Sequence, residues 1–212
     1  VRRNYNMGRK ISVADLRKVH EEHKIWLSTV GEDGSCADLS ETKLSCLKLS
    51  QVNLSKANMS GTDLSSANIW GIILKDTNLR DANLRGTFLL HGAVLTGADL
   101  SEADLTKANL SKAELGNVKL VKANLYKTKL SGANLSGADL SDADLSKTKL
   151  NKTKLSGANL QNACLISTDL KDAGDLTIEQ LSKTKTLYKS KLDSVLMEQV
   201  KEKYPHLLEK PK

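Results

Sequence analysis

Apolar side chains recur every five residues through the central two thirds of the chain. One series runs from Leu39 to Leu89, and after one inserted residue a second series runs from Leu95 to Leu170. These centres are all Leu apart from one Met and one Ile. The position two residues before each centre holds Ala, Thr or another uncharged residue, and the remaining positions are mostly polar. A disordered chain has no reason to keep so strict an apolar phase, so the segment is predicted to be folded.

A period of five matches neither the 3.6-residue turn of an α-helix nor the two-residue repeat of a strand. Two inward residues separated by one outward residue form a minimal strand, and the next two residues must turn the chain. Four such units close a square of about 20 residues, and successive coils stack at roughly 4.8 Å. The pattern therefore predicts an all-β solenoid, a quadrilateral β-helix of about seven coils. Its bore would be filled by Leu with Ala or Thr beside it, which agrees with the presence of only one Phe.

The run SGANLSGADLSDADLSKTKLNKTKLSGANL, at residues 131–160, carries the repeat in its most regular form. It resembles the pentapeptide repeat family, which is of bacterial type and has the signature A(D/N)Lxx. The resemblance covers residues 37–173. It implies a right-handed quadrilateral β-helix, often with a dimer formed at the C-terminal end.

The segment before the repeat predicts a helical cap. Ser12 followed by Asp15 resembles a capping box, and the helix that follows has an apolar face that includes Trp26. Such a cap covers the apolar end of a solenoid, which would otherwise invite end-to-end association.

The segment after the repeat predicts a second helical cap. Thr177 begins a short helix, a loop carrying Leu187 and Leu192 follows, and Asp193 caps a last helix. This region either only covers the end of the rod or also forms a homodimer. The chain is thus predicted to begin with a basic flexible N-terminus (1–11), followed by an N-terminal capping helix with its linker (12–34). The β-helix (35–174), a C-terminal helical cap (175–208) and a tail (209–212) complete it.

The sequence contains no motif that predicts catalysis. A P-loop, a glycine-rich dinucleotide fingerprint and a nucleophile elbow are all absent. His20 and His23 are three residues apart, but no Cys or carboxylate is placed to complete a metal site, so packing or surface roles are favoured. Cys36 and Cys46 are two sides apart on the square and cannot bridge. We therefore expect a non-enzymatic protein with no catalytic residue, cofactor or metal.

Composition adds three expectations. The net charge of +7 favours anionic partners. Three Cys without a framework spacing indicate reduced thiols and a cytoplasmic location. The chain lacks a run of about 18 apolar residues, so membrane insertion is not expected.

The repeat departs from its polar exterior in one region. A candidate interaction patch there consists of Trp70, Ile73, Phe88, Leu90 and Val94, all at outward positions. The inserted residue lies in the same region and predicts a bulge, which re-aims neighbouring side chains. An exposed apolar patch of a few hundred Å² commonly marks an interface. The alternative is that the bulge or the N-terminal segment covers these side chains.

A second departure is a concentration of lysine without arginine. Lys107, Lys127 and Lys147 are 20 residues apart and are predicted to form a vertical ladder on the second face. The whole candidate anion-binding face consists of Lys107, Lys112, Lys127, Lys129, Lys147, Lys149 and Lys152. These lysines either keep the sheet faces soluble and apart or bind an anionic partner. Base-specific nucleic-acid recognition is disfavoured, because Tyr126 is the only aromatic residue nearby.

Three functions compete on this basis. The first is a scaffold for protein–protein interaction, with an unidentified partner, through the apolar patch. The second is electrostatic binding of nucleic acid or another anionic surface through the lysines. The third follows from the family resemblance, because some members mimic duplex DNA and bind type II topoisomerases. Mimicry requires an acidic exterior, so the positive net charge disfavours it.

Overall fold

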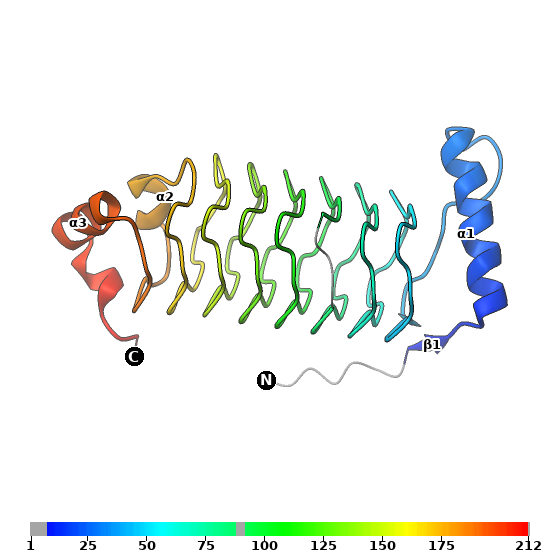
Figure 1. Ribbon diagram of the computed structural model, residues 1–212, viewed down its shortest axis with the longest axis horizontal. Helices are drawn as coiled ribbons and strands as arrows, with labels where there is room; N and C mark the ends of the chain where they lie inside the picture. Colours follow the sequence, from blue (N-terminus) through cyan, green and yellow to red (C-terminus); the bar gives the residue numbers. More distant parts are fainter. Residues whose placement is uncertain (1–7, 88–91, 212) are drawn as a thin grey trace.

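A computed structural model describes residues 8–87 and 92–211, and shows a rod with helices at both ends (Figure 1). Phe88 and Leu90 therefore lie outside the described residues. The elements in chain order are β1 (Arg9–Lys10), α1 (Val13–Ser28), β2 (Thr42–Lys43), α2 (Ile178–Ser182), α3 (Ser194–Lys203) and the 3-10 helix η1 (Pro205–Leu208). None of the helices in this described part is long and apolar enough to cross a membrane.

The rod is built from one-residue parallel bridges rather than long strands. Bridged residues are 20 apart in the first coils, as in Asn58 with Asn78, and 21 apart across the inserted residue, as in Ile73 with Val94. The bridges form four ladders, and we number the corresponding sides of the rod 1 to 4 by their first residues, Asp38, Lys43, Lys48 and Asn53. The predicted all-β solenoid with four sides is therefore the observed architecture.

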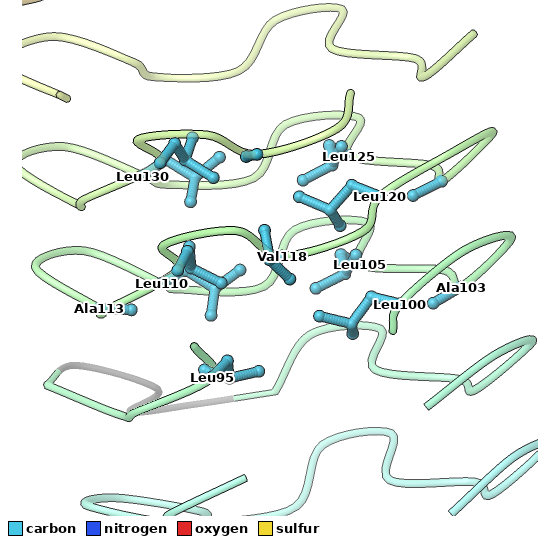
Figure 2. Close-up of a cluster of buried hydrophobic side chains, with 14 of the residues drawn as sticks. Leu95, Leu100, Ala103, Leu105, Leu110, Ala113, Val118, Leu120, Leu125 and Leu130 are labelled. Carbon is cyan, nitrogen blue, oxygen red and sulfur yellow. The ribbon is translucent and has the colours of Figure 1, made fainter. Parts of the chain in front are cut away.

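Leucine side chains fill the bore in stacked layers (Figure 2). Leu105 and Leu125 on side 2 are both completely buried, and they lie one coil apart. Threonine is tolerated beside the centres because its hydroxyl finds a backbone acceptor in the preceding coil. Thr128 Oγ1 donates to the carbonyl of Leu105 at 2.7 Å, and Thr148 Oγ1 donates to that of Leu125 at 2.8 Å. The interior is thus apolar without leaving these hydroxyls unpaired.

Most described corners of the square are β-turns that close on the carbonyl of the buried centre residue. At one corner the N–H of Ala108 donates to the carbonyl of Leu105 at 2.9 Å, and Lys107 between them has a φ of 60°. A positive φ at the third residue is the mark of a type II turn. Glycine fills the equivalent position in other coils, for example Gly132 and Gly137.

The Asp or Asn that precedes most centres has a local structural role. Asp139 Oδ1 accepts from the N–H and the hydroxyl of Ser141 at 3.1 and 2.7 Å, and also from Asn159 Nδ2 one coil further along at 3.0 Å. In the first coil, hydrogen bonds from Ser40 lower the pKa of Asp38. The repeat therefore places Asp or Asn before the centre and Ser after it, because the side chain of the first residue accepts a hydrogen bond from the backbone N–H of the second at the corner.

The N-terminal end is closed by β1 and α1. Arg9 and Lys10 pair in parallel with Thr42 and Lys43, so the predicted flexible N-terminus is wrong for these two residues. The reason is that the first coil exposes an unpaired strand edge, which an extended basic segment can join. Leu16 in α1 packs against the core of the rod.

His23 is the polar contact that docks α1 on the first coil. The side chain is completely buried, its Nδ1 accepts from the N–H of Ala37 at 3.0 Å, and its ring stacks on Trp26 with centroids 5.7 Å apart. Burial lowers the pKa of His23, a shift that the backbone carbonyl of Ser55 partly opposes and His20 reinforces. Because Nδ1 accepts a hydrogen bond, the neutral imidazole is the form that fits this site.

The stability of the N-terminal end is therefore expected to fall with acidification. A folded-state pKa below the usual value of about 6.5 means that the unfolded chain takes up the proton first. The stabilisation that the neutral His23 gives is complete when the pH is above the pKa of the unfolded chain. It is lost as the pH falls through that value and then through the lower pKa of the folded state. Thermal unfolding at pH 7.5 and 5.5 should show a lower Tm in acid. His23→Phe should remove most of this difference and His20→Gln should keep it, whereas an unchanged pH dependence in His23→Phe would contradict the assignment.

The C-terminal end continues the coil between the helices α2 and α3. Leu187 and Leu192, predicted to lie in a loop, are buried at two further inward positions, with Thr186 bridging Cys164 and Lys191 bridging Asp169. Two extra residues between Leu170 and Leu187 hide this unit from a strict five-residue reading, because the bridged residues here are 22 apart instead of 20. The loop prediction is therefore wrong for this segment.

Two helix starts complete the C-terminal end. Thr177, which was predicted to begin a short helix, forms a capping box with Gln180 at the start of α2, and Gln180 Nε2 also donates to the carbonyls of Leu155 and Ala158 at 2.9 and 2.8 Å. Asp193 occupies the N-cap position of α3 but makes no side-chain cap, because its carboxylate accepts from the N–H of Asp172 at 3.2 Å. Both polar side chains thus satisfy backbone groups of the terminal coils.

Candidate interaction surfaces

The apolar patch lies where sides 3 and 4 meet, in the second and third coils. Trp70 and Ile73 are 46% and 37% exposed, and they are the only exposed large apolar side chains of the repeat within the described residues. Val94 is half-buried and bridges Ile73, so these two side chains stand on neighbouring rungs of side 4. The two other predicted members, Phe88 and Leu90, fall outside the described residues.

The predicted lysine face surrounds a single side of the rod. Lys129 and Lys149 are bridge partners on side 3. The ladder of Lys107, Lys127 and Lys147, which belongs to the repeat units of side 2, occupies the corner between sides 2 and 3. The two remaining members, Lys112 and Lys152, occupy the corner between sides 3 and 4. All seven therefore border side 3, and none of them forms an ion pair with a described carboxylate.

Tyr126 organises the middle of the lysine ladder. The ammonium groups of Lys127 and Lys147 lie 5.1 and 5.4 Å from its ring centroid, and Lys147 Nζ donates to its hydroxyl at 3.2 Å. The hydrogen bond from Lys147 lowers the pKa of Tyr126. The aromatic ring thus holds two cations close together on the surface, through cation–π contact.

The same corner carries a second lysine–tyrosine pair, which sequence reasoning missed. Lys189 Nζ lies 5.1 Å from the ring of Tyr188, and Lys191 lies on the side 3 ladder. The signal was present in the sequence as Tyr followed by Lys, as at Tyr126. A loop prediction for the segment around Leu187 places this pair outside the repeat.

The corner lysines occupy a backbone conformation that lysine does not favour. Lys107, Lys112, Lys127, Lys147 and Lys152 have φ values of 58–60°. The left-handed region costs a residue with a side chain on the order of 1 kcal/mol relative to glycine. Five lysines at such positions around one side are therefore not explained by local conformational preference.

The other polar residues considered in the sequence form no site. Within the described ranges, no group of three or more His, Cys, Asp or Glu is arranged to hold a metal ion. Cys36, Cys46 and Cys164 are unpaired. His20 Nδ1 lies 3.9 Å from Glu21 Oε1 at the surface of α1. His23 is the residue that docks α1 on the first coil, as described above.

The chain belongs to the pentapeptide repeat family. The family model described as "Pentapeptide repeats (8 copies)" matches overlapping segments that together run from residue 35 to residue 173. Proteins of this family fold as right-handed quadrilateral β-helices, in agreement with the four-sided rod seen here. No curated protein matches the chain significantly.

Solved structures of the same family resemble the chain. QnrB1, described as a plasmid-mediated fluoroquinolone resistance protein, is 24% identical with a TM-score of 0.54, over 79% of this chain and 82% of that chain. HetL, described as involved in heterocyst differentiation regulation in the cyanobacterium Nostoc, is 30% identical over 74% of this chain and 81% of its own, with a TM-score of 0.26. A thylakoid-lumen protein from Arabidopsis thaliana is 29% identical over 64% of this chain and 72% of its own, with a TM-score of 0.25.

Proposed function

We propose that this protein is a non-enzymatic scaffold, a rod of about seven coils with a helical cap at each end, that binds a protein partner where sides 3 and 4 meet. The observation that carries the proposal is the exposure of Trp70 and Ile73, at 46% and 37%, on a repeat whose other outward positions are mostly polar. Tryptophan is among the side chains that contribute most to protein interfaces, because it buries a large rigid surface at small entropic cost.

The surroundings of the patch favour a partner with acidic residues beside its apolar contact. Lys112 lies at the same corner as Trp70, two coils further along, which is roughly 10 Å at the usual strand spacing. Lys129 and Lys149 lie on side 3, one and two coils beyond Lys112. Positive charge around an apolar centre steers an acidic partner and sets its orientation.

Trp70→Asp is expected to abolish capture of the partner from the native cell. The substitution places a charge in the centre of the apolar contact, which a partner's apolar surface would have to desolvate. Because the contact is apolar, capture by the native protein should survive about 0.3 M salt, where exposed charge interactions are strongly screened. The measurement is affinity capture followed by mass spectrometry of the retained proteins.

Ser136→Asp provides the matched control for this experiment. Ser136 stands at the same position of its repeat unit as Trp70, but at the corner between sides 4 and 1. It should retain the same proteins as the native chain. Equal capture by Trp70→Asp and Ser136→Asp would exclude the patch as the contact.

The second candidate function is binding of a polyanion, such as nucleic acid, by the lysine face. It is favoured by the left-handed backbone of five of its seven lysines, since glycine or asparagine would be cheaper there. The triple variant Lys107→Asn, Lys127→Asn and Lys147→Asn removes three charges with a residue that adopts this backbone readily. The slope of log affinity against log salt for duplex DNA should fall by about 2.7, at roughly 0.9 per charge. An unchanged slope would exclude the ladder as the anion contact.

The likeness to QnrB1 concerns the fold, because the identity is 24%. A net charge of +7 does not suit a mimic of DNA, so interaction with a topoisomerase is not proposed. A homodimer through the C-terminal cap and a cytoplasmic location stay predictions. Val195 on α3 is 66% exposed and would be a natural contact in such a dimer.

A further inference from the structure

A hollow of about 250 Å³ opens between α1 and the first coil. Its inner wall is the end of the apolar bore, where Leu39, Leu49 and Leu54 are 0%, 7% and 2% exposed. Leu16 and Val19 of α1 form the opposite wall, and both pack against the core without being fully buried. The helix therefore covers the end of the bore but leaves an apolar space beneath it.

The titratable side chains that line this hollow are all bases. Arg17, His20 and Lys48 line it, and no carboxylate does. A second hollow beside it shares His20 and adds Lys24, again without a carboxylate. Neither Arg17 nor Lys48 forms an ion pair with a described residue. An apolar interior below unpaired cations suits a ligand with an aliphatic body and a single anionic head.

We propose that the hollow binds a free medium-chain aliphatic carboxylate. The aliphatic chain would lie in the apolar space between α1 and the end of the leucine bore, where burial of each methylene is favourable, and the carboxylate would lie between Arg17 and Lys48. The volume is slightly smaller than the roughly 300–1,000 Å³ of pockets for drug-sized ligands, which favours a slender chain over a ring system. This inference concerns the N-terminal end of the rod and is independent of the partner surface at Trp70.

The test is calorimetric titration of the full-length protein with decanoate, octanoate, decanol and decyltrimethylammonium, all below their micelle concentrations. Decanoate should bind best, and octanoate should bind more weakly by about fourfold for each methylene removed. Decanol should bind more weakly than decanoate, and the cationic amphiphile should not bind. Equal binding of the anionic and cationic amphiphiles, or binding of neither, would overturn the proposal.

Two variants locate the ligand within the molecule. Lys48→Gln keeps an outward polar side chain and should weaken decanoate by about threefold, as expected for one partly exposed ion pair, without affecting decanol. Val19→Trp should fill the hollow and remove binding of both, provided that its far-ultraviolet circular dichroism matches the native spectrum. Unchanged decanoate affinity in Lys48→Gln would overturn the proposed position of the carboxylate even where Val19→Trp does not fold.

Discussion

Replacing Leu125 with Asp is expected to leave the repeat unfolded at room temperature. Leu125 is completely buried, and leucines 20 residues before and after it occupy the neighbouring coils. The variant loses the burial of one leucine and places a carboxylate among methyl groups with no donor in reach. Together these effects cost on the order of 5 kcal/mol or more, comparable with the whole stability of an ordinary domain. Urea titration followed by circular dichroism measures the loss.

Leu125→Met is the matched control for this change. Methionine keeps most of the apolar volume, so its free energy of unfolding should fall by less than about 1.5 kcal/mol. A single cooperative transition with native stability in Leu125→Asp would contradict the assignment of this position to the bore.

Undocking α1 is the second change expected to have a large effect. Removal of residues 1–34 would expose the apolar end of the bore and the unpaired edge of β2, which is covered by β1 in the intact chain. Both features favour pairing with another copy, so the truncated protein should self-associate. Light scattering after size-exclusion chromatography should show a mass that rises with protein concentration.

A point variant separates this effect from the loss of chain length. Leu16→Asp keeps all residues but places a charge between α1 and the bore, and it should self-associate in the same way. Val13→Asp lies on the same helix at a side chain that is 60% exposed, and it should behave as the native protein does. A concentration-independent mass for both the truncated chain and Leu16→Asp would show that α1 does not protect the end.

Much of the fold follows from the five-residue spacing. A centre such as Leu105 must point inward because its phase is kept over many coils, and Ala or Thr beside it leaves room for the leucines of neighbouring sides. The segment around Leu187 was misread for a physical reason. Two extra residues shift its phase, but backbone hydrogen bonds to the preceding coil still hold it in register.

The candidate surfaces were predictable in composition and not in arrangement. Trp70 and Ile73 stand out in the sequence because they break a polar rule. That the lysines of two corners face the same side depends on how the turns direct each side chain. The contact of Lys147 with Tyr126 depends on the stacking of coils, which brings together residues 21 apart.

The sequence by itself determined the solenoid, its four sides and the identity of the inward residues, because a strict local repeat leaves only one way to bury its leucines. Tertiary structure alone decided what happens at the ends and on the surface. The contact of His23 with Ala37 and the hollow under α1 join residues that have no periodic relation in the sequence. The grouping of seven lysines around side 3 joins residues from different coils. Such contacts depend on the docking of elements in space, and no local pattern specifies it.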